Sequence, residues 1–402
     1  MMAQTKEHKI STLYFKGKIM GLFKRTAKKI LSLSMLVPAL HFGGAIACTS
    51  IALKAEDGAV VYGRTMEWGA FDLNSRVAIV PRGYEFQAST PDGKNGLKWK
   101  VKYGTVALDA LEKDYLTDGM NEKGLVVGVL YLPGFADYQD YDPAKASQTI
   151  SELELANYVL TSFATVEEVC EGLANIHVVG TPEPALGNIA APIHLSVVDS
   201  SGKAIVVEYL DGKMKIFDNP LRVLTNSPSF EWHMTNLRNY IGLTSNEHPA
   251  KALTKGESEV DLTPIGAGSG FIGLPGDFTP PSRFIRATAY TQTSRKLVNG
   301  EEALYEVFRI MDNFNLPLVA AEGPSVNPEL LEGMRSSTIW TSAADSKNLK
   351  YYYHTQNNRQ VRMVDLNQID FSKNPDAIRH VEMDKSRKQN IENVTPSDVG
   401  RS

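Results

Sequence analysis

Cysteine is scarce in this 402-residue chain, which contains only Cys48 and Cys170. A disulfide framework of the kind that holds small secreted domains together is therefore not indicated. The chain also lacks an apolar run of the about 20 residues that a membrane-spanning helix needs. It has no Gly-rich phosphate loop of the usual spacing and no His-Glu-x-x-His pair, so we expect neither a cofactor nor a metal ion.

Basic charge is concentrated at the amino terminus. Residues 1–47 hold eight Lys or Arg residues and one Glu, a net charge of +7, so the rest carries −11 where the whole chain carries −4. An acidic chain of this kind argues against nucleic acid or an anionic membrane as a partner. We therefore expect neither nucleic acid nor a membrane to be bound once residues 1–47 are removed.

Residues 1–47 have the layout of a secretory signal peptide. A basic segment precedes the short apolar stretch Ile30–Leu40, and the small residues Ala45 and Ala47 mark a cleavage site. Cleavage there would make Cys48 the first residue of an exported protein, either periplasmic or secreted. Its α-amine, with a reference pKa of about 7.7–8.0, could then act as a base for its own thiol, whose reference pKa is about 8.5.

Beyond the leader, strands and helices come in runs with no regular alternation, which favours an α+β fold over a doubly wound parallel sheet. We expect one domain over residues 48–385 and a charged, disordered tail over residues 386–402. The expected helices are Ser151–Phe163, Val166–Leu173, Leu237–Leu243, Ser282–Ala289 and Glu301–Phe314. Arg222–Thr225 is expected to be a strand. Cys170 lies on the second of these helices, where packing is the simplest role for it.

The first two expected strands, Thr49–Ala55 and Ala59–Thr65, form a hairpin. If Asp57 and Gly58 are a two-residue turn, Cys48 faces Glu67 across the ladder, where a carboxylate could hold the α-amine. Strict alternation then puts Arg64 on the other sheet face, unless a bulge returns it to the sulfur. There its charge would favour the thiolate of Cys48. The alternative is that Arg64 and Glu67 form a surface ion pair.

Eight blocks of the sequence, in the same order, resemble the choloylglycine hydrolase family of bile salt hydrolases and penicillin V acylases. Any one block is weak, but together they are specific and cover roughly Cys48 to Leu366. The blocks are Cys48–Ser50, Gly63–Trp68, Asp118–Leu125, Tyr131–Gly134, Val223–Pro228, Phe230–Tyr240, Gly273–Asp277 and Pro281–Arg286.

The resemblance implies a four-layer αββα sandwich of the N-terminal-nucleophile hydrolase type, with a tetramer as the oligomer. It also implies a catalytic role for each matching residue. Cys48 would attack the amide carbonyl with Arg64 beside its sulfur, and Asn226 would donate to the oxyanion. Arg283 would complete the polar floor of the site. Glu67 stands where the family usually has Asp, which shifts its carboxylate by roughly a bond length.

Tyr131 bears on the substrate. The family commonly has Asn here in bile salt hydrolases and Tyr in penicillin V acylases, and the backbone N–H would be the second oxyanion donor in either case. A Tyr ring narrows the pocket and favours phenoxyacetyl and similar small acyl groups. Bile salts remain a close second, and fatty acyl groups such as those of acyl-homoserine lactones stay open. As an alternative, Tyr131 is a strand aromatic of the core.

Two readings compete with an exported amidase of linear, non-peptide C–N bonds. Cys48 could be the lipid-attachment site of a lipoprotein that only binds its ligand, although Ala45 stands where a lipobox prefers Leu. Lipidation would use both the thiol and the amine, so it excludes catalysis by Cys48. The chain could also be a family member that binds acyl amides without cleaving them. A papain-like protease is not indicated, because its local cysteine signature is absent. His233 either lines the pocket or is structural.

Overall fold

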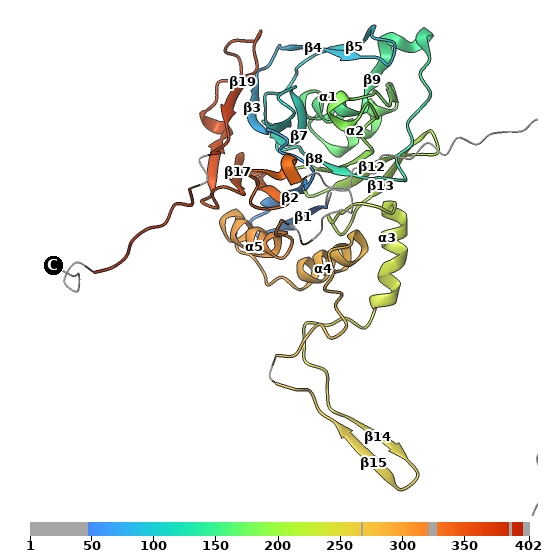
Figure 1. The fold of residues 1–402 in the computed structure, drawn as a ribbon, viewed down its shortest axis with the longest axis vertical. Helices are drawn as coiled ribbons and strands as arrows, with labels where there is room; N and C mark the ends of the chain where they lie inside the picture. The colour runs from blue at the N-terminus through green and yellow to red at the C-terminus, as the bar shows by residue number, and fades with distance from the viewer. Residues whose placement is uncertain (1–46, 267, 319, 321–327, 386–387, 397–402) are drawn as a thin grey trace, which may run out of the picture. The chain divides into compact units, whose positions relative to one another are not determined.

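A computed structural model describes residues 47–266, 268–318, 320, 328–385 and 388–396. Two antiparallel sheets stack face to face, and helices cover the outer face of each (Figure 1). This is the αββα sandwich that the resemblance implied, so the predicted fold class is confirmed. Leader and tail fall partly outside the described residues, and the division into leader, domain and tail stays a prediction.

The smaller sheet carries Cys48 as the first residue of its edge strand. Its five strands, in spatial order, are β1 (Cys48–Lys54), β2 (Val60–Glu67), β16 (Thr338–Asp345), β17 (Lys350–Thr355) and β18 (Arg362–Asp365). Every residue of β2 and β16 is buried, as expected for central strands with a layer on each face.

The larger sheet supplies the opposite wall of the site. Its eight strands, in spatial order, are β13 (Lys213–Asp218), β12 (Ala204–Leu210), β11 (Ile193–Val198), β8 (Val126–Tyr131), β7 (Tyr115–Asn121), β6 (Thr105–Ala110), β3 (Arg76–Val80) and β19 (Arg379–Glu382). The two sheets meet where β1 packs on β8 and β16 packs on β7. Close approach requires glycine here, because a Cβ on Gly128 would come within 2.0 Å of Tyr62 Oη.

Helices cover the outer faces. α1 (Leu155–Ser162) packs on the larger sheet and precedes α2 (Val166–Leu173), while α4 (Pro280–Thr293) and α5 (Gly300–Asp312) pack on the smaller sheet. Thr165 caps the amino terminus of α2, since its side chain accepts a hydrogen bond from the Glu168 N–H. The predicted helices at 166–173, 282–289 and 301–314 therefore match within a few residues.

Two predicted elements are wrong. Arg222–Thr225 is not a strand, since only Leu224 bridges Ser50 at the outer edge of β1. A helix does not begin at Leu237, because α3 spans Phe230–Asn236 and a single 3₁₀ turn follows it. Both errors arise from short apolar segments, whose structure is set by the neighbours they contact more than by their own periodicity.

The predicted register of the first hairpin is also wrong. Cys48 pairs with Met66, not with Glu67, because the loop has three residues and Ala55 closes it on Ala59. The third loop residue, Gly58, has φ +86°, which glycine adopts without strain. A shift of one residue exchanges the two faces of a strand, and the side chain of Arg64 therefore lies on the same face as Cys48 without any bulge in β2.

Three two-stranded sheets lie outside the sandwich core. They are β4 (Glu85–Ser89) with β5 (Asn95–Lys100), β9 (Thr149–Ser151) with β10 (His177–Val179), and β14 (Lys251–Lys255) with β15 (Ser258–Leu262). The β14–β15 hairpin extends away from α3 and α4, and all of its strand residues are exposed (Figure 1). Among the described residues, no helix has the length and apolar character to cross a bilayer.

Candidate active site

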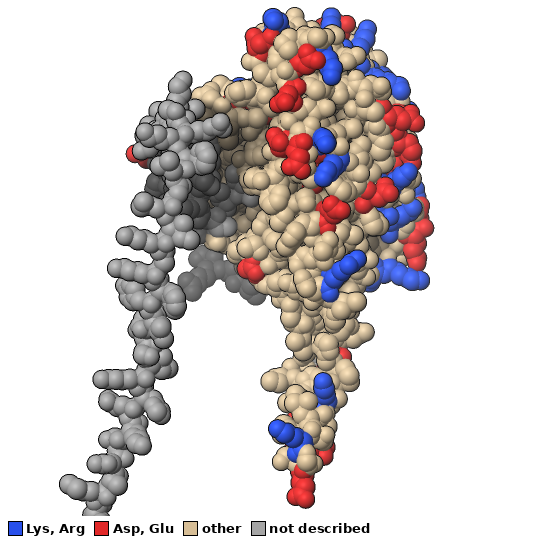
Figure 2. Space-filling view, turned by 90° about the vertical axis from the view of Figure 1, so that its right-hand side faces the viewer, with Lys and Arg blue, Asp and Glu red and all other residues tan. Residues whose placement is uncertain are grey.

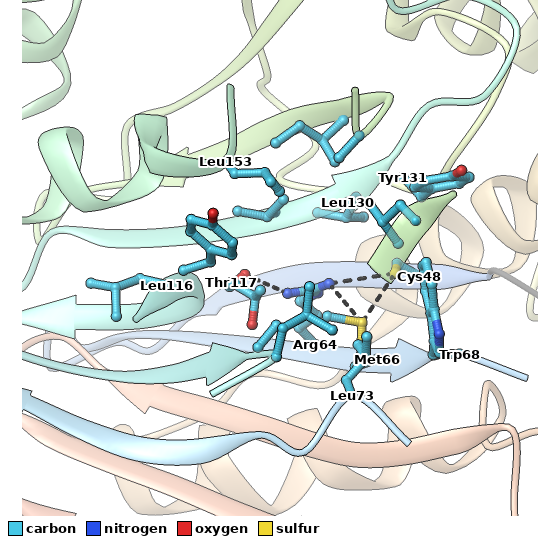
Figure 3. Close-up of a pocket in the computed structure, with 17 residues that line it drawn as sticks. Cys48, Arg64, Met66, Trp68, Leu73, Leu116, Thr117, Leu130, Tyr131 and Leu153 are labelled. Atoms are coloured by element: carbon cyan, nitrogen blue, oxygen red, sulfur yellow. Dashed lines mark hydrogen bonds between the residues drawn. The ribbon is translucent and has the colours of Figure 1, made fainter. Parts of the chain in front are cut away.

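Cys48 lies at the junction of a cavity and a polar network. Its side chain is buried, and Sγ accepts a hydrogen bond from Arg64 Nη2 at 3.4 Å (Figure 3). Met66 Sδ lies 3.9 Å from the same sulfur, as the corrected register predicts for a cross-strand pair. The backbone nitrogen of Cys48 donates to Asn226 Oδ1 at 2.7 Å. Sulfur and nitrogen of one residue thus each have a defined partner.

Arg64 is fixed in the space between the two sheets. Its Nη1 donates to the Thr117 carbonyl at 2.6 Å, and the guanidinium lies 3.9 Å from Asp118 Oδ2 and 5.1 Å from the centre of the Trp340 ring. Burial disfavours the charged form, but the charges of Cys48 and Asp118 outweigh it and raise the pKa of Arg64. A permanent cation is therefore held against the sulfur.

Asp118 is a site residue that the motif analysis quoted but gave no role. Ser342 Oγ donates to its Oδ1 at 2.7 Å, and the Tyr351 hydroxyl donates to the same oxygen. Burial raises the pKa of Asp118, while the Arg64 charge and these hydrogen bonds oppose the rise. The sequence signal for Asp118 was its place in a block that resembles the family. Sequence alone did not show that its strand lies beside the strand of Arg64.

Arg283 approaches Cys48 from α4. Its Nη1 donates to the Cys48 carbonyl at 2.5 Å and to Thr49 Oγ1 at 2.8 Å, and its Nη2 donates to Asn226 Oδ1 at 2.7 Å. Burial lowers the pKa of Arg283 to about 10, so it remains charged at neutral pH. Arg283 therefore links the backbone of Cys48 to Asn226, which agrees with the expected polar floor.

The side-chain oxygen of Asn226 accepts two hydrogen bonds. Oδ1 accepts from the Cys48 nitrogen and from Arg283, while Nδ2 donates to the Tyr131 carbonyl at 2.7 Å. The oxygen and nitrogen of the amide are thus distinguished by their partners, and a carboxamide carries two N–H bonds on Nδ2. One of them is left over for a substrate oxygen, although the oxyanion role itself stays a prediction.

Glu67 lies on the opposite face of β2 from Cys48. Its Oε1 accepts from Thr338 Oγ1 at 3.1 Å, next to a bulge in β16 between Thr338 and Trp340. Burial raises the pKa of Glu67 to about 7, against the charge of Arg283. The predicted cross-strand contact to the amine of Cys48 is therefore wrong, and so is the surface ion pair, since Arg64 and Glu67 are both buried.

The cavity beside Cys48 is apolar. The cavity has a volume of about 80 Å³, and aliphatic side chains of the larger sheet and of several segments outside the sheets form most of its wall. The wall includes Leu73, Leu116, Val129, Leu153, Leu186 and Ile193. Sequence reasoning did not identify this wall, because its leucines are spread over segments that only the fold brings together.

Tyr131 lines the mouth at the end of β8. Its ring packs edge-to-face on Trp68, with centroids 5.8 Å apart, and Figure 3 shows both rings beside Cys48. The side chain is half-buried, which raises the pKa of its hydroxyl. The prediction that Tyr131 narrows the pocket agrees with this position, and the ring also packs against the hydrophobic core, as the alternative expected.

The other candidates lie outside the cavity. Cys170 is a half-buried residue of α2, as predicted, and both cysteines are free. In the part of the chain that is described, one cluster of Asp109, Asp114 and His380 has the spacing for a metal ion. Arg76 contacts both carboxylates, at 2.6 Å and 3.5 Å, and so offsets part of their negative charge.

The chain is similar to known proteins both in sequence and in fold. Residues 48–380 match the linear amide C–N hydrolases of the choloylglycine hydrolase family. A bile salt hydrolase/transferase of Clostridium perfringens is 35% identical over 323 residues, which are 80% of this chain and 92% of the relative.

Two solved structures are similar in fold as well as in sequence. A conjugated bile acid hydrolase from C. perfringens superposes with a TM-score of 0.71 at 31% identity, covering 87% of this chain and 100% of the other. A penicillin V acylase from Agrobacterium tumefaciens gives 0.64 at 30% identity, covering 83% and 91%. The chain therefore belongs to the choloylglycine hydrolase family and is a hydrolase of linear amide C–N bonds.

Proposed function

We propose that Cys48 is the nucleophile of an amidase for acylated small molecules and acts as the first residue of the mature chain. The observation that carries the proposal is the hydrogen bond from Arg64 Nη2 to Cys48 Sγ at the wall of an apolar cavity. A buried cation beside a sulfur favours the thiolate, which is the reactive form. A cavity on the same side gives an acyl group a place to bind.

In the proposed reaction, the sulfur forms a bond to the substrate carbonyl carbon while the α-amine of Cys48 takes the thiol proton. Asn226 Nδ2 and the Tyr131 N–H donate to the developing oxyanion. The C–N bond then breaks, and the proton passes to the leaving amine to give a thioester. Water attacks that thioester, with the amine again as base, and releases the carboxylic acid and the thiol.

The mechanism requires a free α-amine, so we propose export with removal of residues 1–47. The hydrogen bond between the Cys48 nitrogen and Asn226 Oδ1 supports this, since it would orient an amine as well as an amide. Mass spectrometry of the exported protein tests it: we expect a chain that begins at unmodified Cys48. A diacylglycerol adduct on Cys48, or another first residue, would end the proposal in favour of a lipoprotein or an unprocessed binding protein.

For the acyl group, we propose phenoxyacetyl amides first and conjugated bile salts second. Tyr131 and Trp68 give the mouth two aromatic faces, which suits a phenyl-bearing acyl group. The similarity of the chain to a solved penicillin V acylase and to a solved bile acid hydrolase supports both substrate classes as candidates. A panel of penicillin V, glycocholate, taurocholate and a long-chain acyl-homoserine lactone, assayed with the processed enzyme, ranks them. No turnover of any of the four would count against the amidase proposal.

We also propose a homo-oligomer, with a tetramer as the expected state. The β14–β15 hairpin supports it, because an isolated two-stranded hairpin is marginal in water and this one exposes Leu253, Val260 and Leu262. Sedimentation velocity of the intact protein and of a Leu253→Ser/Val260→Ser variant measures the state. We expect the variant to dissociate, and a monomeric wild type would contradict the proposal.

A further inference from the structure

Asn226 is held through its backbone by two buried histidines that do not reach the cavity. His194 Nε2 contacts the Thr225 carbonyl at 2.9 Å, and His233 Nε2 contacts the Asn226 carbonyl at 2.8 Å. Both histidines are buried, as are Thr225 and Asn226. The two carbonyls that flank the Asn226 Cα are thus each bonded to a ring nitrogen.

The hydrogens of both rings follow from these contacts. A carbonyl oxygen only accepts, so Nε2 of His194 and Nε2 of His233 must each carry a hydrogen. Burial lowers the pKa of His233 to about 4, and this ring therefore stays neutral at physiological pH with its hydrogen on Nε2. Each histidine thus acts as a fixed donor to the backbone at Asn226.

His194 has a second anchor on the far side of its ring. Nδ1 lies 2.9 Å from Glu208 Oε1, and the same oxygen accepts from the Phe230 N–H at 3.0 Å. Glu208 belongs to β12 and His194 to the adjacent β11, and Phe230 begins α3. A carboxylate that contacts both the ring and the helix fixes the ring relative to two elements.

His233 is fixed by stacking. Its ring lies parallel to Phe284 in α4, with centroids 4.7 Å apart and planes 12° apart. Phe284 follows Arg283, which itself donates to Asn226 Oδ1. His233, which bonds the backbone of Asn226, thus packs on the residue next to Arg283, which bonds the Asn226 side chain.

We propose that His194 and His233 are positioning residues that fix Asn226 for the chemical step, through hydrogen bonds to its flanking carbonyls. The proposal rests on the proposed role of Asn226. Hydrogen-bond geometry at an oxyanion is demanding: a displacement of about 1 Å costs about 10²-fold in rate. Losing one histidine contact should accordingly reduce kcat about tenfold or more and leave KM nearly unchanged, because neither ring lines the cavity.

Matched substitutions separate positioning from simple packing. Gln can place its amide nitrogen near the site of Nε2, so His194→Gln and His233→Gln keep the donor to the carbonyl. Asn is shorter and reaches only the place of Nδ1, so His194→Asn and His233→Asn lose that donor while keeping a polar side chain. With penicillin V as substrate, we expect the Gln variants to stay within about threefold of wild-type kcat and the Asn variants to lose about tenfold or more.

A double-variant comparison adds a second readout. In an Asn226→Ala background the Asn substitutions should have little further effect on kcat, because the group they position is absent. Equal losses in the Gln and Asn variants, or losses that simply multiply with Asn226→Ala, overturn the proposal.

Crystal structures of the variants give a readout independent of turnover. We expect the contact between the Cys48 nitrogen and Asn226 Oδ1 to persist in His194→Gln and to lengthen beyond hydrogen-bonding distance in His194→Asn. An unchanged contact in both His194 variants overturns the positioning proposal, whatever the activity of the wild type. Failure of the wild type to cleave any substrate of the panel counts separately, against the amidase assignment. If His194→Asn does not fold, the His233 pair decides by the same distance and kcat criteria.

Discussion

The two sides of Cys48 have opposite chemistry. On the cavity side, aliphatic side chains surround the sulfur and Arg64 is the one charged residue of the wall. On the other side lies what we call the polar frame, made of Asn226, Arg283, His194, Glu208 and His233, with hydrogen bonds at 2.5–3.0 Å. The cavity side is suited to holding an acyl group, and the frame is suited to fixing the reacting atoms.

The outer surface of the protein differs from both the cavity and the polar frame in its charge. Figure 2 shows Lys and Arg side chains interspersed with Asp and Glu on one face of the body, without a field of a single sign. This face therefore has no basic stripe of the kind that binds nucleic acid, and the absence of a nucleic-acid partner stays a prediction.

The largest expected effect comes from removing the sulfur where the two sides meet. Cys48→Ala should fold and yet lose about 10⁴-fold or more in kcat, since loss of a nucleophile removes the covalent route. Cys170→Ala is the matched control: it removes the other thiol, in α2, and should keep wild-type turnover. Steady-state assays with circular dichroism on both variants check this, and near-normal turnover by Cys48→Ala would refute the nucleophile assignment.

The second prediction separates the frame from the cavity by kinetic signature. Asn226→Ala should reduce kcat about 10²–10³-fold with a small change in KM, as expected when an oxyanion donor is lost. Leu153→Ala, on the cavity wall, should instead raise KM, since it removes contacts that the bound and transition states share. If both variants changed the same parameter, the division into a binding side and a chemical side would be wrong.

Sequence reasoning predicted part of the polar frame but not the cavity wall. The frame residues Asn226 and Arg283 lie in contiguous blocks that resemble the family, and the structure brings them to Cys48. The cavity wall was missed, because its leucines come from separate strands and loops.

The predicted register, and with it the contact between Glu67 and Cys48, failed for a different reason, although Arg64 does lie beside the sulfur as the resemblance implied. One extra residue in the Glu56–Gly58 loop exchanges the faces of β2, and a dipeptide turn signal cannot fix loop length. The layered α+β fold was predictable from the order of strands and helices. The exact partners across the sheet were not, since they depend on contacts far apart in the sequence.

The third prediction measures what burial in this region costs. Glu67 is fully buried and has a pKa of about 7 in the folded protein, against a reference of 4.5. Below pH 4.5 the group is protonated in both states and costs nothing. As pH rises from 4.5 to 7, ionisation favours the unfolded chain, which lowers the free energy of unfolding by about 3 kcal/mol.

Glu67→Gln removes that titration and tests the sign. Urea unfolding at several pH values should show the variant gaining stability relative to wild type between pH 4.5 and 7, with a constant difference outside this window. Other buried acids, such as Glu152, titrate equally in both proteins and cancel in the difference. Parallel curves across the whole range would mean that folding does not raise the pKa of Glu67, which would contradict the prediction.

The smallest expected effect is at Tyr131, which belongs to both sides: its ring borders the cavity, and its carbonyl accepts from Asn226 Nδ2. Tyr131→Asn keeps the backbone contact and removes the ring from Trp68, so kcat should change little while the ratio of kcat/KM for penicillin V over glycocholate falls about tenfold. Tyr131→Phe keeps the ring and should keep the ratio. A loss of kcat on both substrates in Tyr131→Asn would instead place the side chain in the polar frame, because only the frame should act on the chemical step irrespective of the acyl group.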